Sequence, residues 1–242
     1  MDKIHIVTVR NPRDPIAEAY RTLRTNIQFS SFDKKIQSIM ITSSGPGEGK
    51  STTSANLAVV MAETGARTIL IDCDQRKPKL HKIFLTSNET GLSNLLADKA
   101  GFEDAVKKNV VKNLDLLPSG MRPPNPAELL ASRKMENFLQ ELKEKYEYII
   151  LDTPPVVAVT DAQLLSRYVD GCLLVIASSQ AEKEAVVKAR DLLLKVGANI
   201  IGAVLNKLEV KGKGYYGYYY QYYYGEDGKK VKEKKKRKRI GR

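Results

Sequence analysis

Short apolar runs alternate along this chain with stretches whose apolar residues recur every three or four positions. Runs of strand length are typical of strands buried on both faces, and they occur at 36–41, 67–74, 113–118, 148–152, 171–177 and 200–205. Helical spacing predicts helices at 12–30, 51–64, 89–98, 127–145, 160–168 and 181–196. This alternation predicts an α/β fold, in which helices cover both faces of a mostly parallel sheet.

The first predicted helix carries charged residues away from its apolar stripe. The stripe residues are four, three and four positions apart: Ile16, Tyr20, Leu23 and Ile27. The charged residues are Glu18, Arg21 and Arg24. Charge spacing alone favours a solvated face with a weak intrahelical ion pair, worth about 0.2–0.5 kcal/mol. The alternative is a helix that pairs its charges with a neighbouring subunit.

A glycine-rich loop separates the first apolar run from the predicted helix that follows it. Its residues are Gly45, Pro46, Gly47, Glu48, Gly49, Lys50, Ser51 and Thr52. Glycines let backbone N–H groups turn inward around an anion, and the helix N-terminus adds positive charge. Lys50 would contact the outer phosphates of a nucleotide, and the Ser51 hydroxyl would bind Mg²⁺. The strict pattern has glycine where this chain has Ser44, so we predict a variant phosphate-binding loop rather than a plain glycine-rich turn.

Carboxylates end two of the apolar runs. Asp72 and Asp74 are two positions apart, and alternate residues of a strand share a face, so both acids should point the same way. Asp152 ends the run 148–152 and would hold Mg²⁺ directly or through water. Open α/β sheets place their chemistry at the carboxyl ends of parallel strands, which indicates a nucleotide site here. An aspartate-rich turn that caps the next segment is the alternative for Asp72 and Asp74.

The last apolar run ends at two polar residues, Asn206 and Lys207. These side chains would either line the adenine pocket of a nucleotide or merely begin a turn. The sequence leaves both interpretations open.

Most of the positive charge lies at the end of the chain. The 242 residues carry a formal net charge of +12, and residues 229–242 contribute +9 of it through ten Lys/Arg and one Glu. A protein that binds nucleic acid through its folded body spreads positive charge over a face, so we do not expect a nucleic-acid partner.

The cysteines and the hydropathy indicate a cytoplasmic chain. Cys73 and Cys172 lie in apolar runs without metal-ligand spacing, which predicts buried thiols in a reducing cytosol. No run approaches the roughly 20 apolar residues of a membrane-spanning helix, and no N-terminal apolar segment follows a basic start. We expect a chain that is neither exported nor inserted by itself.

The composition changes abruptly near residue 211, which predicts one domain at 1–210 and a disordered tail at 211–242. Eight of the twelve tyrosines lie in this tail: Tyr215, Tyr216, Tyr218, Tyr219, Tyr220, Tyr222, Tyr223 and Tyr224. Without aliphatic partners they cannot build a core. They could stack on single-stranded nucleic acid, or form a low-complexity segment with no function. In a third interpretation they accept phosphoryl groups, once a base takes the proton that a phenol holds up to a pKa of about 10.

Several segments together resemble motifs of the bacterial tyrosine kinases. Those that resemble the three Walker motifs are the loop 45–52, the strand and turn 69–78, and the strand and turn 150–155. Those that resemble further motifs are 18–24, 89–93 and 123–126. The similarity covers residues 14–224 and includes the tyrosine cluster.

The resemblance implies an ATP- and Mg²⁺-dependent protein-tyrosine kinase that autophosphorylates its tail and controls capsule or exopolysaccharide synthesis. It implies that Glu18, Arg21 and Arg24 form the contact of a ring-shaped homo-oligomer, which reverses the interpretation that charge spacing favours. Neighbours in the ring would phosphorylate each other's tails. The implied activator is the cytosolic tail of a membrane-embedded modulator protein, which would place the chain at the inner face of the membrane. Proteins of polysaccharide synthesis would be its substrates.

We expect a division of roles among the site residues. The loop amides and Lys50 would hold the phosphates, while Ser51, Asp74 and Asp152 organise Mg²⁺. Asp72 would orient and deprotonate the incoming phenol, although Asp72 and Asp74 could exchange roles because they share a face.

The alternative function is that of a MinD/ParA-like ATP-switched ATPase that binds membrane or nucleic acid. Those proteins also carry a variant Walker A loop. Their signature has lysine where this chain has Gly45, which argues against their mechanism.

Overall fold

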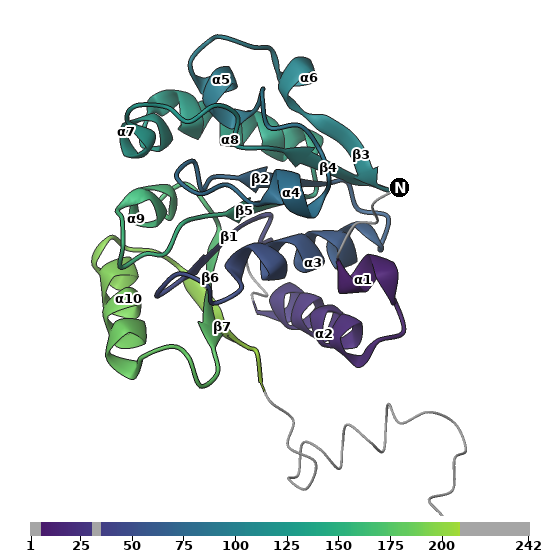
Figure 1. Ribbon diagram of the computed structural model, residues 1–242, viewed down its shortest axis with the longest axis vertical. Helices are drawn as coiled ribbons and strands as arrows, with labels where there is room; N and C mark the ends of the chain where they lie inside the picture. Colours follow the sequence, from purple (N-terminus) through teal and green to yellow (C-terminus); the bar gives the residue numbers. More distant parts are fainter. Residues whose placement is uncertain (1–5, 31–34, 209–242) are drawn as a thin grey trace, which may run out of the picture. The chain divides into compact units, whose positions relative to one another are not determined.

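The computed structural model describes residues 6–30 and 35–208, which form one sheet between layers of helices (Figure 1). Within these residues seven strands pair in the order β3-β4-β2-β5-β1-β6-β7. Neighbouring strands are parallel except for the edge pair β3 and β4, which is antiparallel. The strands are β1 (Ser38–Ser43), β2 (Thr68–Asp72), β3 (Lys107–Val111), β4 (Leu114–Leu117), β5 (Tyr148–Asp152), β6 (Gly171–Ala177) and β7 (Ile200–Asn206). The predicted mostly parallel sheet is confirmed.

Helices cover both faces of this sheet. They are α1 (Val7–Arg10), α2 (Pro15–Phe29), α3 (Lys50–Ala62), α4 (Leu80–Ile83), α5 (Leu92–Leu96), α6 (Phe102–Ala105), α7 (Pro126–Leu130), α8 (Arg133–Lys145), α9 (Asp161–Leu165) and α10 (Lys183–Lys195). Buried side chains of α8 share a core with Ile149 and Leu151 of β5, whereas those of α3 share a second core with Ile150. Because successive strand residues point to opposite faces, α8 and α3 lie on opposite sides of the sheet. Helix α2 packs against α3 (Figure 1).

No helix in the described part of the chain combines the length and the apolar character that crossing a bilayer requires.

The stretch 127–145, predicted as one helix, contains two helices, α7 and α8. Between them Ser132 has an extended backbone, and its side chain accepts a hydrogen bond from the N–H of Met135. A serine in this position is an N-cap, which satisfies a free amide and starts a new helix. The prediction of a single helix is therefore wrong at Ala131 and Ser132.

Strand β3 and three short helices were not predicted. Strand β3 has the sequence Lys-Lys-Asn-Val-Val and lies partly exposed at the sheet edge, so it lacks the apolar run of a buried strand. Helices α1, α4 and α6 have four residues each. One helical turn is too short to show a periodic pattern.

Helix α2 buries a slightly different stripe from the predicted one. Tyr20 and Ile27 are buried as expected, but Ile16 is 52% exposed. Ala17 takes its place, because it precedes Tyr20 by three residues and lies on the same helix face.

The two cysteines are buried free thiols, as predicted. Burial raises the pKa of the Cys172 thiol to about 12, so this side chain stays protonated at neutral pH and packs as a small apolar group.

Candidate active site

The glycine-rich loop connects β1 to α3, which is the order that a phosphate-binding loop requires. Gly47 and Gly49 have φ values of 79° and 94°, in the left-handed region that side chains other than glycine rarely adopt. A Cβ on Gly49 would also lie 2.0 Å from Nδ2 of Asn206, so any other residue there would displace the Asn206 side chain. The loop therefore has the glycines where its backbone needs them, directly before the N-terminus of α3.

Glu48 fixes the shape of this loop, a role that the sequence pattern did not predict. Its side chain is buried, and Oε1 accepts hydrogen bonds from Ser44 Oγ at 2.5 Å and from the backbone N–H of Gly45. The second carboxylate oxygen accepts the N–H of Ala177, at the end of β6, at 3.2 Å. Ser44 stands where the strict loop pattern has glycine, and its hydroxyl supplies a hydrogen bond to Glu48 that glycine could not make.

Lys50 lies among the predicted carboxylates. Its Nζ is 2.9 Å from Asp74 Oδ2 and 4.0 Å from Asp152 Oδ1. All three side chains are buried, and Ser54 Oγ donates to Asp152 Oδ1 at 3.2 Å. The structure thus brings together residues from three separate segments at the carboxyl ends of β2 and β5 and the start of α3.

Asp72 lies beside this group but is fully buried. Its Oδ2 accepts the backbone N–H groups of Lys79 and Leu80 at 3.0 and 2.9 Å, and its Oδ1 accepts that of Asp74 at 3.2 Å. These bonds hold the turn after β2. Asp72 therefore caps the turn after β2, which was the alternative interpretation, and it also lies next to the predicted site residues.

The pKa values of the buried charges reflect their mutual contacts. Burial and then the charge of Asp152 raise the pKa of Asp72 to about 7. Burial also raises the pKa of Asp152, although the Lys50 charge opposes this shift. For Lys50, burial lowers the pKa, but the charges of Asp152 and Asp74 outweigh it and leave the pKa raised. Lys50 therefore stays protonated, while Asp72 titrates near neutrality.

Ser51, Asp74 and Asp152 fit the chemistry of a Mg²⁺ site. Their hydroxyl and carboxylate oxygens are ligands that Mg²⁺ prefers, and Asp152 Oδ2 is buried without a hydrogen-bond partner. In the described residues, no three His, Cys, Asp or Glu side chains gather closely enough to hold a metal ion by themselves. Mg²⁺ typically takes one or two carboxylates together with substrate phosphates, which matches this donor set.

An ion pair that the sequence did not predict fixes the segment after Asp74. Arg76 Nε and Nη2 donate to Asp161 Oδ2 and Oδ1 at 3.0 and 2.9 Å. Asp161 is fully buried at the first position of α9, and a two-bond pair of this kind sets orientation as well as distance. The two residues are 85 positions apart, so no local pattern could have paired them.

Asn206 and Lys207 both bond to the phosphate loop. Asn206 Nδ2 donates to the Glu48 carbonyl at 2.9 Å, and Lys207 Nζ donates to the Gly47 carbonyl at 2.6 Å. Lys207 also has a φ of 56°, in the left-handed region, so the chain turns there. The structure therefore places Asn206 against the backbone of the loop, and whether it lines an adenine pocket stays a prediction.

The charged residues of α2 lie away from the carboxylate group and bond within the chain. Arg21 pairs with Glu18 at 3.0 Å and with Glu63 at 3.2 Å. Arg24 Nη1 donates to the carbonyl of Val60 at 2.7 Å. The predicted tail 211–242 with its tyrosines, and the predicted boundary at 210, lie outside the described residues.

The loop between β1 and α3, together with the acids that end β2 and β5, defines a nucleotide-binding protein of the P-loop type. A family model described as an AAA domain matches residues 36–199, which include all of these elements.

Two relatives identify the family within this class. The tyrosine-protein kinase YwqD of Bacillus subtilis is 46% identical over 214 residues, which cover 88% of this chain and 90% of YwqD. The tyrosine-protein kinase wzc of Salmonella typhimurium is 36% identical over 215 residues, which cover 88% of this chain but 30% of wzc. The chain belongs to the family of bacterial tyrosine-protein kinases, as its motifs predicted.

Solved structures support the same assignment. The kinase domain of the Escherichia coli tyrosine kinase ETK superposes with a TM-score of 0.83 at 34% identity, covering 89% of this chain and 85% of that domain. MinD of Pyrococcus horikoshii, solved with Mg-ADP, gives a TM-score of 0.60 at 27% identity, with coverages of 70% and 69%. The MinD-like switch is thus only a distant relation.

Proposed function

We propose that this kinase transfers the γ-phosphoryl group of ATP, bound with Mg²⁺, to the tyrosines of its own C-terminal tail. The observation that carries the proposal is the buried group of Lys50, Asp74 and Asp152 beneath a phosphate-binding loop. The same chain holds eight tyrosines in a ten-residue stretch, so acceptors are tethered to the site. Its regulatory output would be capsule or exopolysaccharide synthesis, as the family resemblance implies.

Binding would begin with an exchange of partners at Lys50. Its ammonium group now pairs with Asp74 at 2.9 Å, and the phosphates of the nucleotide would take over this donor. Asp74 would then be free to hold Mg²⁺ with Ser51 and Asp152. Mg²⁺ supplies charge neutralisation on the phosphates, and the loop amides and Lys50 supply positioning.

Asp72 is the proposed base for the acceptor. Its pKa of about 7 suits a group that takes a proton near neutral pH. The phenolic oxygen would attack the γ-phosphorus in line, its proton would pass to Asp72, and the bond to the β-phosphate oxygen would break to release ADP. Because Asp72 is fully buried, the tyrosine could reach it only after neighbouring side chains move, as Lys50 would when it turns to the phosphates.

Intact-mass analysis across a pH series tests both the reaction and the base. With MgATP the chain should gain mass in steps of one phosphate, and kcat/KM should rise with pH through about 7 as Asp72 loses its proton. Asp72→Asn should lose this rising limb together with most of the rate. Release of free phosphate without any mass gain would instead support an ATP-switched ATPase.

The assembly is proposed to be a ring whose contact involves Glu18, Arg21 and Arg24. A guanidinium has five N–H donors, and the described contacts of Arg21 and Arg24 leave donors for carboxylates of a neighbour. Transfer between neighbours would follow from such a ring.

Sedimentation velocity tests the ring contact. The full chain should sediment well above its monomer mass of 27.0 kDa, and Arg24→Ala should shift it toward the monomer. Lys188→Ala, at an exposed position on α10, serves as the matched control and should leave the assembly unchanged. A wild-type chain that stays monomeric at micromolar concentration would contradict the proposal.

The proposed activator is the cytosolic tail of a membrane-embedded modulator, which would hold the kinase at the inner membrane face. The larger size of wzc supports this idea, because there a kinase region like this chain makes up 30% of a longer protein. Protein substrates would belong to polysaccharide synthesis. Fractionation of cells with and without the modulator is the test, and membrane association that persists without it would refute this part.

A further inference from the structure

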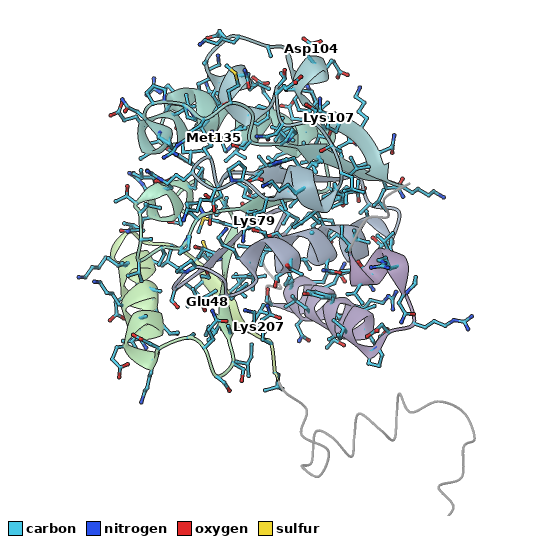
Figure 2. The ribbon with its side chains drawn as sticks, viewed as in Figure 1. Glu48, Lys79, Asp104, Lys107, Met135 and Lys207 are labelled. Atoms are coloured by element: carbon cyan, nitrogen blue, oxygen red, sulfur yellow. The ribbon has the colours of Figure 1, made fainter. Side chains whose placement is uncertain are left out.

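Three backbone carbonyl groups of the phosphate loop accept hydrogen bonds from side chains that lie outside the loop. Ser43 Oγ donates to the Gly45 carbonyl at 2.7 Å, and Asn206 Nδ2 to that of Glu48 at 2.9 Å. Between them, Lys207 Nζ donates to the Gly47 carbonyl at 2.6 Å. Figure 2 shows Glu48 and Lys207 close together. In the sequence, Asn206 and Lys207 are 158 and 160 positions from the loop residues that they contact. The loop backbone is therefore oriented by the end of β7.

Peptide geometry turns these carbonyl contacts into amide orientation. A trans peptide is planar, and its C=O and the following N–H point in opposite directions. A bond to the Gly47 carbonyl therefore fixes the direction of the Glu48 N–H, on the other side of the same peptide. In a loop of this type the inward-facing amides are the groups that bind phosphate.

The Gly47–Glu48 peptide needs such a restraint. Gly47 has a φ of 79°, and glycine reaches left-handed and right-handed backbone conformations with similar ease. Without an external bond this peptide could rotate and turn its N–H away from the phosphates. The carboxylate of Glu48 restrains the start of the loop, at Ser44 and Gly45, and ties it to Ala177 of β6, but it does not bond to this carbonyl.

Lys207 is itself held in place for this contact. Its Nζ also donates to Gln180 Oε1 at 2.7 Å, and Gln180 Nε2 lies 3.3 Å from the point where a Cβ on Gly47 would stand. The backbone of Lys207 is in the left-handed region, with a φ of 56°. A non-glycine residue rarely adopts this conformation, which indicates that its surroundings determine it.

We propose that Lys207 is a positioning residue of the kinase, which orients the Glu48 amide toward the nucleotide through the Gly47 carbonyl. It does not contact the reacting atoms. The inference rests on the proposed binding of MgATP by this loop. Because an amide on the phosphates acts in the ground state and in the transition state alike, losing its orientation should raise KM for ATP and leave kcat nearly unchanged.

The experiment compares variants of the full chain by titration with MgADP and by ATP kinetics. Lys207→Met should raise the Kd for MgADP and the KM for ATP about 5- to 10-fold, with kcat within about 2-fold, because it loses a hydrogen bond from a charged donor. Lys207→Arg, which keeps a donor, should bind within about 2-fold of wild type. Lys188→Met on α10 removes an exposed lysine elsewhere and should change neither constant.

The outcomes separate this inference from the proposed function. If wild type binds no MgADP, the proposed function fails. If wild type binds but Lys207→Met binds equally well, or loses kcat at unchanged KM, the positioning role is refuted. Gln180→Leu, which removes the second partner of Lys207, should give a smaller rise in Kd in the same direction. If Lys207→Met does not fold, the Kd of Gln180→Leu for MgADP decides the question, and an unchanged Kd would refute the positioning role.

Discussion

Replacing Lys50 with methionine should abolish phosphorylation of the tail. Lys50 is the one cation within 4.0 Å of both Asp74 and Asp152 in the described residues, so its removal leaves the phosphates without their buried positive partner. Loss of such a charge in phosphoryl transfer costs about 10³-fold or more in rate. Intact-mass analysis after incubation with MgATP should show no added phosphate.

The same substitution should also destabilise the chain, and the effect should depend on pH. Removing one partner of a buried ion pair costs about 3–5 kcal/mol, because the remaining charge stays buried. The pKa of Asp152, already raised by burial, should rise further without Lys50. The folded chain then holds protons that the unfolded chain releases above pH of about 4, so stability falls as pH rises.

Denaturant unfolding at two pH values measures this prediction. Lys50→Met should lose more stability relative to wild type at pH 8 than at pH 5.5, where protonated carboxyls need no cation. Lys188→Met is the control for loss of a surface lysine. Wild-type phosphate incorporation by Lys50→Met would overturn the assigned role of this residue.

Changing all eight tail tyrosines to phenylalanine should eliminate autophosphorylation while nucleotide binding remains. The substituted residues are Tyr215, Tyr216, Tyr218, Tyr219, Tyr220, Tyr222, Tyr223 and Tyr224. Phenylalanine keeps the aromatic ring and removes only the hydroxyl, so it tests the acceptor and not the bulk of the tail. Tyr148→Phe, in β5, is the matched control and should incorporate phosphate as wild type does.

Mixing two inactive chains tests whether transfer occurs between subunits. The phenylalanine chain has an intact site without acceptors, and Lys50→Met has acceptors without an active site. If neighbours phosphorylate each other, the mixture should add phosphate to the Lys50→Met chain alone. Undiminished phosphate on the phenylalanine chain by itself would refute the tail as the acceptor.

The sequence predicted those parts of the fold and site that short-range pattern encodes. Buried parallel strands are continuous apolar runs, so the order of residues alone was enough to place β2 and β5 and the acids at their ends. The glycine spacing likewise marked the loop that precedes α3. These signals are local, because backbone conformation and strand burial are set by neighbouring residues.

The rest depends on contacts between distant residues. The pairs Arg76–Asp161 and Glu48–Ala177 join segments that are 85 and 129 positions apart. Nothing at either partner's own position marks the pairing. The break between α7 and α8 did have a local signal. Ser132 is an N-cap residue, and the buried residues of α7 (Pro126, Leu130) and of α8 (Met135, Phe138, Leu139, Leu142) do not form one helical stripe.

Helix α3 connects the proposed nucleotide site with the proposed contact surface on α2. It begins at Lys50 beside the phosphate loop and ends at Ala62, next to Glu63, which pairs with Arg21 of α2. Thirteen helical residues make a rod about 20 Å long, and Arg24 bonds to the Val60 carbonyl on its last turn. A helix is stiff along its axis, so a displacement at one end moves the other. If protomers meet through α2 as proposed, nucleotide binding at the start of α3 would therefore be coupled to the contact between protomers, and loosening that contact would weaken nucleotide binding.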